Sequence, residues 1–354
     1  MKHFSSSGIL LTIQDKIEKE LAEFLKSIKS RFSGKKIEPV LFDSIEDFLL
    51  RKGKRLRPVL FIISYLGFAE KAKKRLYTTA VSFEFLHDFL LVHDDIIDKA
   101  FIRRGKPSMH KILESAFVNR QNKKFNGEDL AIIAGDILYA LAIDSFLSIE
   151  EKKLNKERAL KKFIESAVWT ELGEFLELIY GLKPVDKITL QDIYQVYTMK
   201  TAYYTFAYPL SIGAVLAGAN QKQVDALFNC GLLLGRAFQI KDDILGIFGE
   251  ESGTGKSSFT DLKEEKKTIL IWFGYNNASL SQKKTIRNIF NKRIVLYKDL
   301  LKMREILINT GALEYAKEQI NILVKDAEKD LVRLQMKPEY KNIILDYSHQ
   351  ILQV

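Results

Sequence analysis

The chain has 354 residues, of which 47% are hydrophobic and 28% are charged, a composition typical of a folded globular protein. This composition excludes disorder over most of the chain and a collagen-like repeat. Glycine and proline together make up about 7% of the residues, against a usual value of ~12%. So few turn-forming residues argue against a β-protein with many hairpins, and we expect an all-α protein.

The net charge of +10 is compatible with a nucleic acid, an anionic membrane surface or an anionic small substrate as partner. Most lysines and arginines are mixed with acids in amphipathic stretches, such as residues 152–162 and 283–304, which is typical of solvated helix faces. The sequence has neither a basic stripe interleaved with aromatic residues nor a nucleic-acid motif. We therefore expect an anionic small substrate and no nucleic acid.

Cys230 is the only cysteine, which excludes an intramolecular disulfide and a thiolate-rich zinc site. Residues 1–32 match neither a signal peptide nor an anchor, so we expect a cytoplasmic protein. Residues 201–221 carry no charge and are long enough to be considered as a membrane span. Their first half is rich in Thr and Tyr, however, and this favours a buried core helix and no transmembrane segment.

Apolar residues recur three and four positions apart in six stretches, the period of helices that face a core. The stretches are residues 9–32, 76–97, 130–147, 160–179, 224–248 and 306–334. The breaks between them are short enough to be interhelical loops, and no linker or internal repeat divides the chain. We predict a single domain over residues 1–354 with ten or more helices.

Acidic residues concentrate at the end of one apolar stretch, in the segment LLVHDDIIDKAFIRR at residues 90–104. Asp94 and Asp98 lie four residues apart and share one helix face, with Asp95 beside them. Two charges ~4 Å apart repel by about 1 kcal/mol in water and about 4 kcal/mol at an effective dielectric constant of 20. This arrangement favours a bound Mg²⁺, which uses carboxylates and substrate phosphates as ligands. The alternative is a solvated acidic turn.

A second acidic pair, Asp242–Asp243, ends another mostly apolar helix. If the two helix ends face one another across a cavity, Asp94, Asp98 and Asp242 could hold several Mg²⁺ ions that also bind a diphosphate. Basic residues would complete the anion site. The candidates are Lys54, Arg55 and Arg57 in KGKRLRP, together with Arg103 and Arg104.

The sequence GEESGTGKSS at residues 249–258 resembles a P-loop, but its first glycine lies one residue too far from Lys256. An apolar helix precedes it where a P-loop requires a strand. We expect instead a glycine-rich lid that presents Lys256 to a phosphate.

Together these segments resemble the trans-isoprenyl diphosphate synthase family, the head-to-tail polyprenyl synthetases. The first aspartate-rich motif corresponds to DDIID at residues 94–98, followed by RRG at 103–105. The second corresponds to FQIKDDILG at 238–246. GKRLRP at 53–58 and the pair Lys200-Thr201 occupy the places of further family motifs. The resemblance extends from about residue 43 to residue 268.

The resemblance implies an isoprenoid-synthase-like helical bundle around a deep central cavity, usually as a homodimer. It implies condensation of isopentenyl diphosphate with an allylic diphosphate, with three Mg²⁺ ions when substrate is bound. Asp94, Asp98 and Asp242 would ligate Mg²⁺. The allylic diphosphate would be bound by Arg103, Lys200 and Lys256, with Lys266 nearby. Isopentenyl diphosphate would be bound by Lys54, Arg57, His87 and Arg104, while Thr201 and Gln239 would line the reacting centre.

Product length depends on the residues that precede the first motif on its helix. Phe89 lies five residues before Asp94, about 7.5 Å along a helix, and Phe85 and Leu86 lie one turn further. An aromatic residue at this position resembles the archaeal type of geranylgeranyl diphosphate synthase. We therefore expect a C20 product, with the C15 farnesyl product as the alternative. The simpler interpretation is that Phe89 only packs in the core.

The chain departs from the family pattern in four places. The family's Gly-Gln-x-x-Asp motif is GEFLE at residues 173–177, so that Glu174 and Glu177 replace an amide and an aspartate. Glu174 cannot donate an amide hydrogen bond, whereas Glu177 could still reach a metal through water. Gly246 stands in place of a third aspartate, Lys52 replaces a glycine, and residues 351–354 lack basic side chains.

Two other functions remain open at this point. His93-Asp94 matches the HD pair of metal phosphohydrolases, which would require more histidine ligands and no second acidic helix end. A catalytically silent partner subunit is the other alternative, although such proteins usually lose their acidic residues. Diphosphate release that depends on Mg²⁺ and both substrates would separate the three functions.

Overall fold

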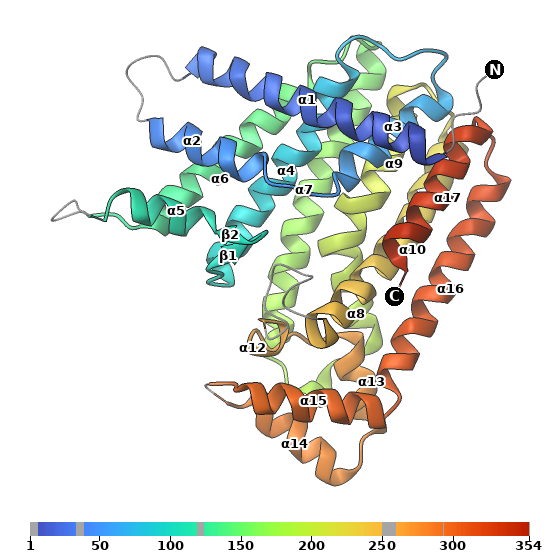
Figure 1. Cartoon of the computed structure of the whole chain (residues 1–354). Helices are drawn as coiled ribbons and strands as arrows, with labels where there is room; N and C mark the ends of the chain where they lie inside the picture. Colours follow the sequence, from blue (N-terminus) through green and yellow to red (C-terminus); the bar gives the residue numbers. More distant parts are fainter. Residues whose placement is uncertain (1–5, 33–38, 119–123, 250–259, 293, 354) are drawn as a thin grey trace. The chain divides into compact units, whose positions relative to one another are not determined.

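The computed structural model of this chain describes residues 6–32, 39–118, 124–249, 260–292 and 294–353 (Figure 1). The described residues are almost entirely helical, and their only strands form a two-residue antiparallel ladder. This confirms the predicted all-α fold class. Their contacts divide into two compact units. The first comprises Met1–Lys162, Ile212–Ala219 and Lys337–Ile343, and the second Phe163–Ser211, Asn220–Met336 and Ile344–Val354. The single domain over residues 1–354 stays a prediction.

The first unit is built around α4 (Leu76–Ile97), which coincides with the predicted stretch 76–97. Phe83 is buried on this helix, and its ring centroid lies 5.0 Å from that of Phe61 and 6.5 Å from that of Phe146. Each aromatic pair adds about 0.5–1.5 kcal/mol to the burial of its area. The other elements are α1 (Ser6–Phe32), α2 (Pro39–Leu49), α3 (Leu56–Phe68), β1 (Ile102–Arg103), β2 (Lys106–Pro107), α5 (Met109–Ala116) and α6 (Gly127–Phe146).

The second unit is built around α10 (Gln221–Phe248), which packs against the π-helix η2 (Tyr197–Ala207) and against α16 (Ala312–Arg333). Its further elements are η1 (Val185–Lys187), α8 (Leu190–Val196), α12 (Thr260–Lys263), α13 (Ile269–Asn277), α14 (Leu280–Phe290) and α15 (Tyr297–Asn309). α7 (Lys153–Gly181), α9 (Tyr208–Leu216) and α17 (Pro338–Leu352) have residues in both units.

Helix ends follow local sequence signals. Asn220 begins α10 with a capping box, in which its side chain accepts from the N–H of Gln223.

The predicted stretch 306–334 is wrong as one helix, because α15 ends at Asn309 and α16 begins at Ala312. Gly311 lies between them with φ +74°. This left-handed conformation is readily adopted by glycine and ends the first helix.

The uncharged stretch 201–221 is divided between η2 and α9 and contributes fully buried residues such as Leu210 and Ile212. Among the helices of the described ranges, none has the combination of length and apolar character that crossing a membrane requires.

Candidate functional site

The predicted metal ligands of the first unit lie at the end of α4. A carboxylate oxygen of Asp94 and one of Asp98 lie within 4.8 Å of one another. Asp98 caps the helix, and its backbone N–H donates to the carbonyl of Asp94 at 2.8 Å. Two carboxylates of this spacing match the hard oxygen ligands that Mg²⁺ prefers. The residues present therefore fit the metal that the sequence implies.

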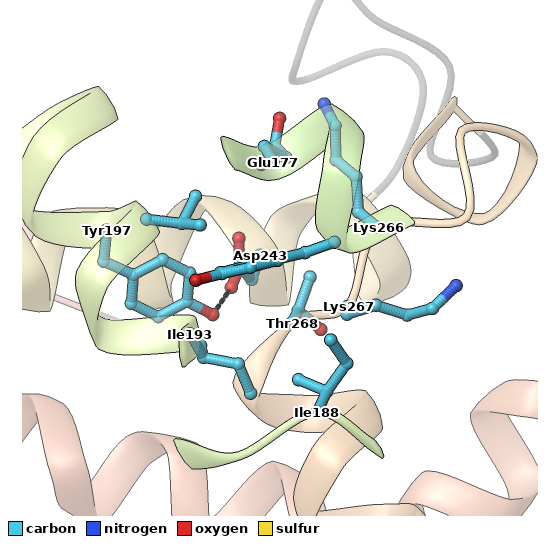
Figure 2. A pocket seen from close by; sticks show the side chains of 10 residues that line it. Glu177, Ile188, Ile193, Tyr197, Asp243, Lys266, Lys267 and Thr268 are labelled. Atoms are coloured by element: carbon cyan, nitrogen blue, oxygen red, sulfur yellow. Dashed lines mark hydrogen bonds between the residues drawn. The ribbon is translucent and has the colours of Figure 1, made fainter. Parts of the chain in front are cut away.

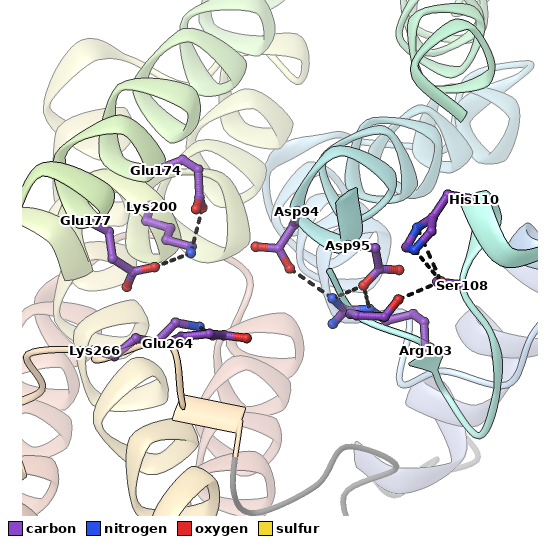
Figure 3. A network of polar contacts seen from close by, with 11 residues as sticks. Asp94, Asp95, Arg103, Ser108, His110, Glu174, Glu177, Lys200, Glu264 and Lys266 are labelled. Carbon is purple, nitrogen blue, oxygen red and sulfur yellow. Dashed lines mark hydrogen bonds and ion pairs between the residues drawn. The ribbon is translucent and has the colours of Figure 1, made fainter. Parts of the chain in front are cut away.

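Asp95, between these two acids, serves a different purpose. It is fully buried and accepts hydrogen bonds from Arg103, including one from Nε at 2.7 Å, while Nη2 of Arg103 donates to Asp94 at 2.9 Å (Figure 3). Burial opposes the charge of Arg103, but Asp95 and Asp94 raise its pKa above the usual value. Arg103, predicted to bind diphosphate, is thus oriented by the acidic motif itself.

A β-turn places the next arginine. Arg104 and Gly105 both have positive φ, 53° and 74°, between β1 and β2. Arg51, which is buried, donates to the carbonyls of Arg103 at 2.9 Å and Pro107 at 2.8 Å, and so fixes this hairpin.

The structure brings the predicted isopentenyl diphosphate ligands together in the first unit. A Cβ atom built on Gly53 would lie 3.9 Å from Cζ of Arg104, so the Gly53–Lys54 turn lies beside this guanidinium. Burial lowers the pKa of His87 well below its usual value, and the positive charges of Arg57 and Arg104 lower it further. His87 is therefore a neutral imidazole, able to donate one hydrogen bond.

Arg55, which the sequence also suggested for the anion site, points instead toward Glu18 and Glu84. Its guanidinium is buried, donates to Glu84 at 2.6 Å and to Glu18 at 2.7 Å, and also reaches the carbonyls of Leu49 and Arg51. Arg55 therefore ties α1, α3 and α4 together, and it is not placed to bind a substrate.

The three residues predicted to set the length of the prenyl product lie in different environments. Phe85 and Leu86 are fully buried, and the ring of Phe85 contacts that of Phe24 at 5.6 Å between centroids. Phe89 is half-buried, and its ring lies 5.1 Å from the ring of Tyr139 on α6. Tyr139 was not predicted from the sequence, because nothing in the local pattern of α6 indicates which residue of α4 it faces.

In the second unit, the two aspartates of the second motif have different environments. Asp242 is exposed, whereas Asp243 is buried. Asp243 accepts a hydrogen bond from the hydroxyl of Tyr197 (Figure 2). It accepts a second one, at 2.9 Å, from Nε2 of Gln239. The same tyrosine oxygen accepts from the backbone N–H of Ile269 at 2.8 Å, at the start of α13. Burial and Asp243 raise the pKa of Tyr197, so the phenol stays protonated.

This hydrogen-bond chain extends to the predicted reacting centre. The hydroxyl of Thr201 donates to Oε1 of Gln239, whose amide nitrogen donates to Asp243. The structure thus brings Thr201 and Gln239 together, and it links them to Tyr197 and Asp243. Their role at the reacting centre stays a prediction. Tyr197 was missed because it lies four residues before Thr201, outside the Lys-Thr pair.

Lys200 lies between the two acids that depart from the family pattern. Its ammonium group is 2.5 Å from carboxylate oxygens of both Glu174 and Glu177 (Figure 3). The approach of α7 to η2 depends on Gly173, where a Cβ atom would lie 2.3 Å from the backbone nitrogen of Lys200. The two glutamates therefore hold and partly neutralise this lysine.

The remaining predicted anion ligands are lysines near the second motif. Lys266 pairs with Glu264 at 2.7 Å (Figure 3). With Glu177, Tyr197 and Asp243 it lines a small hollow in the second unit (Figure 2). Lys256 and residues 250–258 of the predicted lid lie outside the described residues.

An all-helical fold that carries two aspartate-rich helix ends and clustered cations defines a class of enzymes acting on diphosphates. Comparison with known proteins gives the family. The family model described as polyprenyl synthetase matches residues 38–307. The chain belongs to this family of prenyltransferases.

Individual relatives support this assignment. The chain is 33% identical to geranylgeranyl diphosphate synthase of Sulfolobus acidocaldarius, over 90% of this chain and 92% of the relative. It is 30% identical to geranylfarnesyl diphosphate synthase of Aeropyrum pernix, over 94% and 98%. Among solved structures, geranylgeranyl pyrophosphate synthase of Corynebacterium glutamicum, complexed with isoprenyl diphosphate and magnesium, has a TM-score of 0.87 at 27% identity, covering 95% and 97%.

Proposed function

We propose that this prenyltransferase joins isopentenyl diphosphate head-to-tail to an allylic diphosphate and releases geranylgeranyl diphosphate, C20, as its main product. The paired oxygens of Asp94 and Asp98 at the end of α4 carry the proposal most directly, because they fit the metal that such a reaction uses. The geranylgeranyl synthases among the relatives support the C20 product.

We assign the metal to Asp94 and Asp98 of the first unit and to Asp242 of the second, with three Mg²⁺ ions when substrate is bound. The bound ions would stabilise the negative charge that develops on the diphosphate leaving group. The protein's own cations assist the same ionisation. These are Arg103, Lys200, Lys256 and Lys266, which we propose bind the allylic diphosphate.

Lys54, Arg57, His87 and Arg104 would hold the diphosphate of isopentenyl diphosphate, whose double bond attacks the allylic carbocation. Thr201 and Gln239 line this centre and would position the reacting carbons. A proton is then lost to the departing diphosphate, so the reaction requires no side-chain nucleophile. Apolar walls must exclude water, which would otherwise capture the cation.

The decisive experiment incubates purified protein with isopentenyl diphosphate and dimethylallyl, geranyl or farnesyl diphosphate, with Mg²⁺ or with EDTA. Diphosphate release should require Mg²⁺ and both substrates, and mass analysis should show a C20 product. Absence of turnover would favour the silent subunit, and phosphate release from one substrate alone would favour the hydrolase. Asp98→Asn should abolish most of the turnover. Asp144→Asn, which alters a half-buried acid of α6 that pairs with Arg31, is the matched control.

We also propose the homodimer that the family resemblance implies. Four exposed apolar residues, Val168, Leu172, Phe175 and Ile179, follow one another at helical spacing on α7. A contiguous apolar stripe of this kind is typical of a protein interface.

We also propose a cytoplasmic location for this enzyme, and cell fractionation would test it.

A further inference from the structure

Asp88 is a buried acid of the first unit that the proposed mechanism does not use. Its side chain is completely inaccessible to solvent, one residue beyond His87 on α4. Neither of its oxygens has a hydrogen-bond partner within the part of the chain that the structure describes. The guanidinium of Arg104 lies nearby, with its Nη2 atom 3.4 Å from Oδ1 of Asp88. A buried carboxylate normally has several hydrogen bonds, so this position calls for an explanation.

The other charged groups around Asp88 do not replace these hydrogen bonds. Glu84, one turn earlier on α4, repels it, while Arg55, Arg57 and Arg104 attract it. Arg55 already donates hydrogen bonds to Glu84 and to Glu18 of α1. Burial is the largest effect and raises the pKa of Asp88 to about 7, although Arg104 acts in the opposite direction. The carboxyl group is therefore balanced between its two protonation states near neutral pH.

Arg104 offers the complementary group. Its Nη1 has no hydrogen-bond partner among the described residues, although it is buried. A diphosphate that accepts a hydrogen bond from Arg104 would satisfy this donor. It would also neutralise the positive charge of Arg104, which is the closest counter-charge of Asp88. It would also bring at least two negative charges into the neighbourhood of the carboxylate. Both effects disfavour the ionised form of Asp88.

We propose that Asp88 is a positioning residue for Arg104, and that it takes up a proton from solvent when the diphosphate of isopentenyl diphosphate binds. The proton adds to the carboxylate, and no bond of the substrate changes in this step. This inference rests on the proposed function, because it names the substrate that Arg104 holds.

Proton uptake on binding weakens binding as pH rises through the pKa of the group. With Asp88 titrating near 7, linkage predicts that the KM for isopentenyl diphosphate rises about tenfold between pH 6 and pH 8 through this group alone. The substrate's own ionisation acts equally on wild type and variants, so the ratio of their KM values isolates Asp88.

The test compares wild type with Asp88→Asn, which keeps the shape and cannot ionise. At saturating Mg²⁺ and allylic substrate, the wild-type to variant ratio of KM for isopentenyl diphosphate should rise about tenfold from pH 6 to pH 8. The pH profile of kcat should stay parallel in the two proteins. Asp144→Asn removes a half-buried acid that pairs with Arg31 at 3.1 Å, and its KM ratio should not change with pH.

Calorimetry of isopentenyl diphosphate binding, in buffers with different heats of ionisation, measures the proton directly. Wild type should take up more protons than Asp88→Asn at pH 7.5. Asp88→Ser provides a second neutral variant if the asparagine protein does not fold. Equal proton uptake and parallel KM profiles would overturn the inference while the proposed function stands. Absence of any prenyl product from wild type would overturn the function instead.

Discussion

In each aspartate-rich motif, two neighbouring aspartates have opposite environments. Asp95 and Asp243 are buried and accept hydrogen bonds from Arg103 and Tyr197, whereas Asp94 and Asp242 keep access to solvent. Successive residues on a helix point about 100° apart, so the two members of each pair face different surroundings. The second aspartate of each motif thus orients its surroundings, and the first, which reaches solvent, is the one that we propose as a metal ligand.

Phe89 is the residue on which product length should depend. Phe89→Ala removes the ring that faces Tyr139 at 5.1 Å, and the space that it leaves should admit a longer chain. We expect products longer than those of wild type, measured by mass analysis of the extracted prenyl alcohols. Phe273→Ala makes the same truncation on α13, where the ring stacks on Tyr315 at 4.1 Å, and it should leave product length unchanged. An unchanged chain length in Phe89→Ala would assign Phe89 to core packing alone.

At the scale of the element, the π-helix η2 is held by contacts that only small residues permit. Cβ atoms on Gly231 and Gly235 of α10 would lie 2.5 and 2.4 Å from Cα atoms of η2. Gly173 of α7 meets the same helix at the backbone of Lys200. These glycines allow η2 to approach two helices closely, and so they set the positions of Lys200 and Thr201.

Gly173→Ala should therefore displace η2. A Cβ atom 2.3 Å from the nitrogen of Lys200 requires a backbone shift, which typically costs about 1–3 kcal/mol of unfolding free energy. The KM for the allylic diphosphate should also rise, because Lys200 moves. Gly181→Ala, on the same helix, meets no atom within 4 Å and should change stability by less than about 0.5 kcal/mol. Equal melting curves for the two variants would contradict this account.

The hydroxyl of Tyr197 joins η2, α10 and α13. Tyr197→Phe leaves the carboxylate of Asp243 and the N–H of Ile269 without this partner. Each buried group left unsatisfied costs about 1–3 kcal/mol, so for these two groups urea unfolding should show a loss of about 2–6 kcal/mol. kcat should fall as well, because Gln239 shares Asp243.

Tyr194→Phe is the matched control for this prediction. It removes a part-buried hydrogen bond of 3.2 Å to Gln319 and should cost no more than about 1 kcal/mol. If the two tyrosine variants lose the same stability and keep wild-type kcat, the chain from Tyr197 to Gln239 has no positioning role.

At the scale of the whole molecule, the exposed stripe of α7 makes the association of two chains testable. Phe175 is 61% exposed, and Phe175→Glu places a charge at the centre of the stripe. Burying an unpaired charge is costly, so the variant should be monomeric in light scattering where wild type is dimeric. Leu280→Glu alters a residue on α14 that is 87% exposed, and it should leave the dimer intact. A monomeric wild type would refute the dimer.

The sequence by itself determined the class of fold and the chemistry, because both follow from local patterns. Apolar spacing predicted α4 to the residue, and two acidic helix ends with basic neighbours indicated a metal and a diphosphate. The one helix expected over residues 306–334 failed at Gly311, because its apolar spacing continued across the left-handed turn.

Only the tertiary structure decided how each polar side chain is used. It turned Arg55 inward to Glu84, placed Lys200 between Glu174 and Glu177, and left Asp88 beside Arg104. Such outcomes depend on burial and on partners that are remote in sequence. Neither can be deduced from helical periodicity, because residues on the same helix face can meet solvent, a carboxylate or a guanidinium, depending on which element packs there.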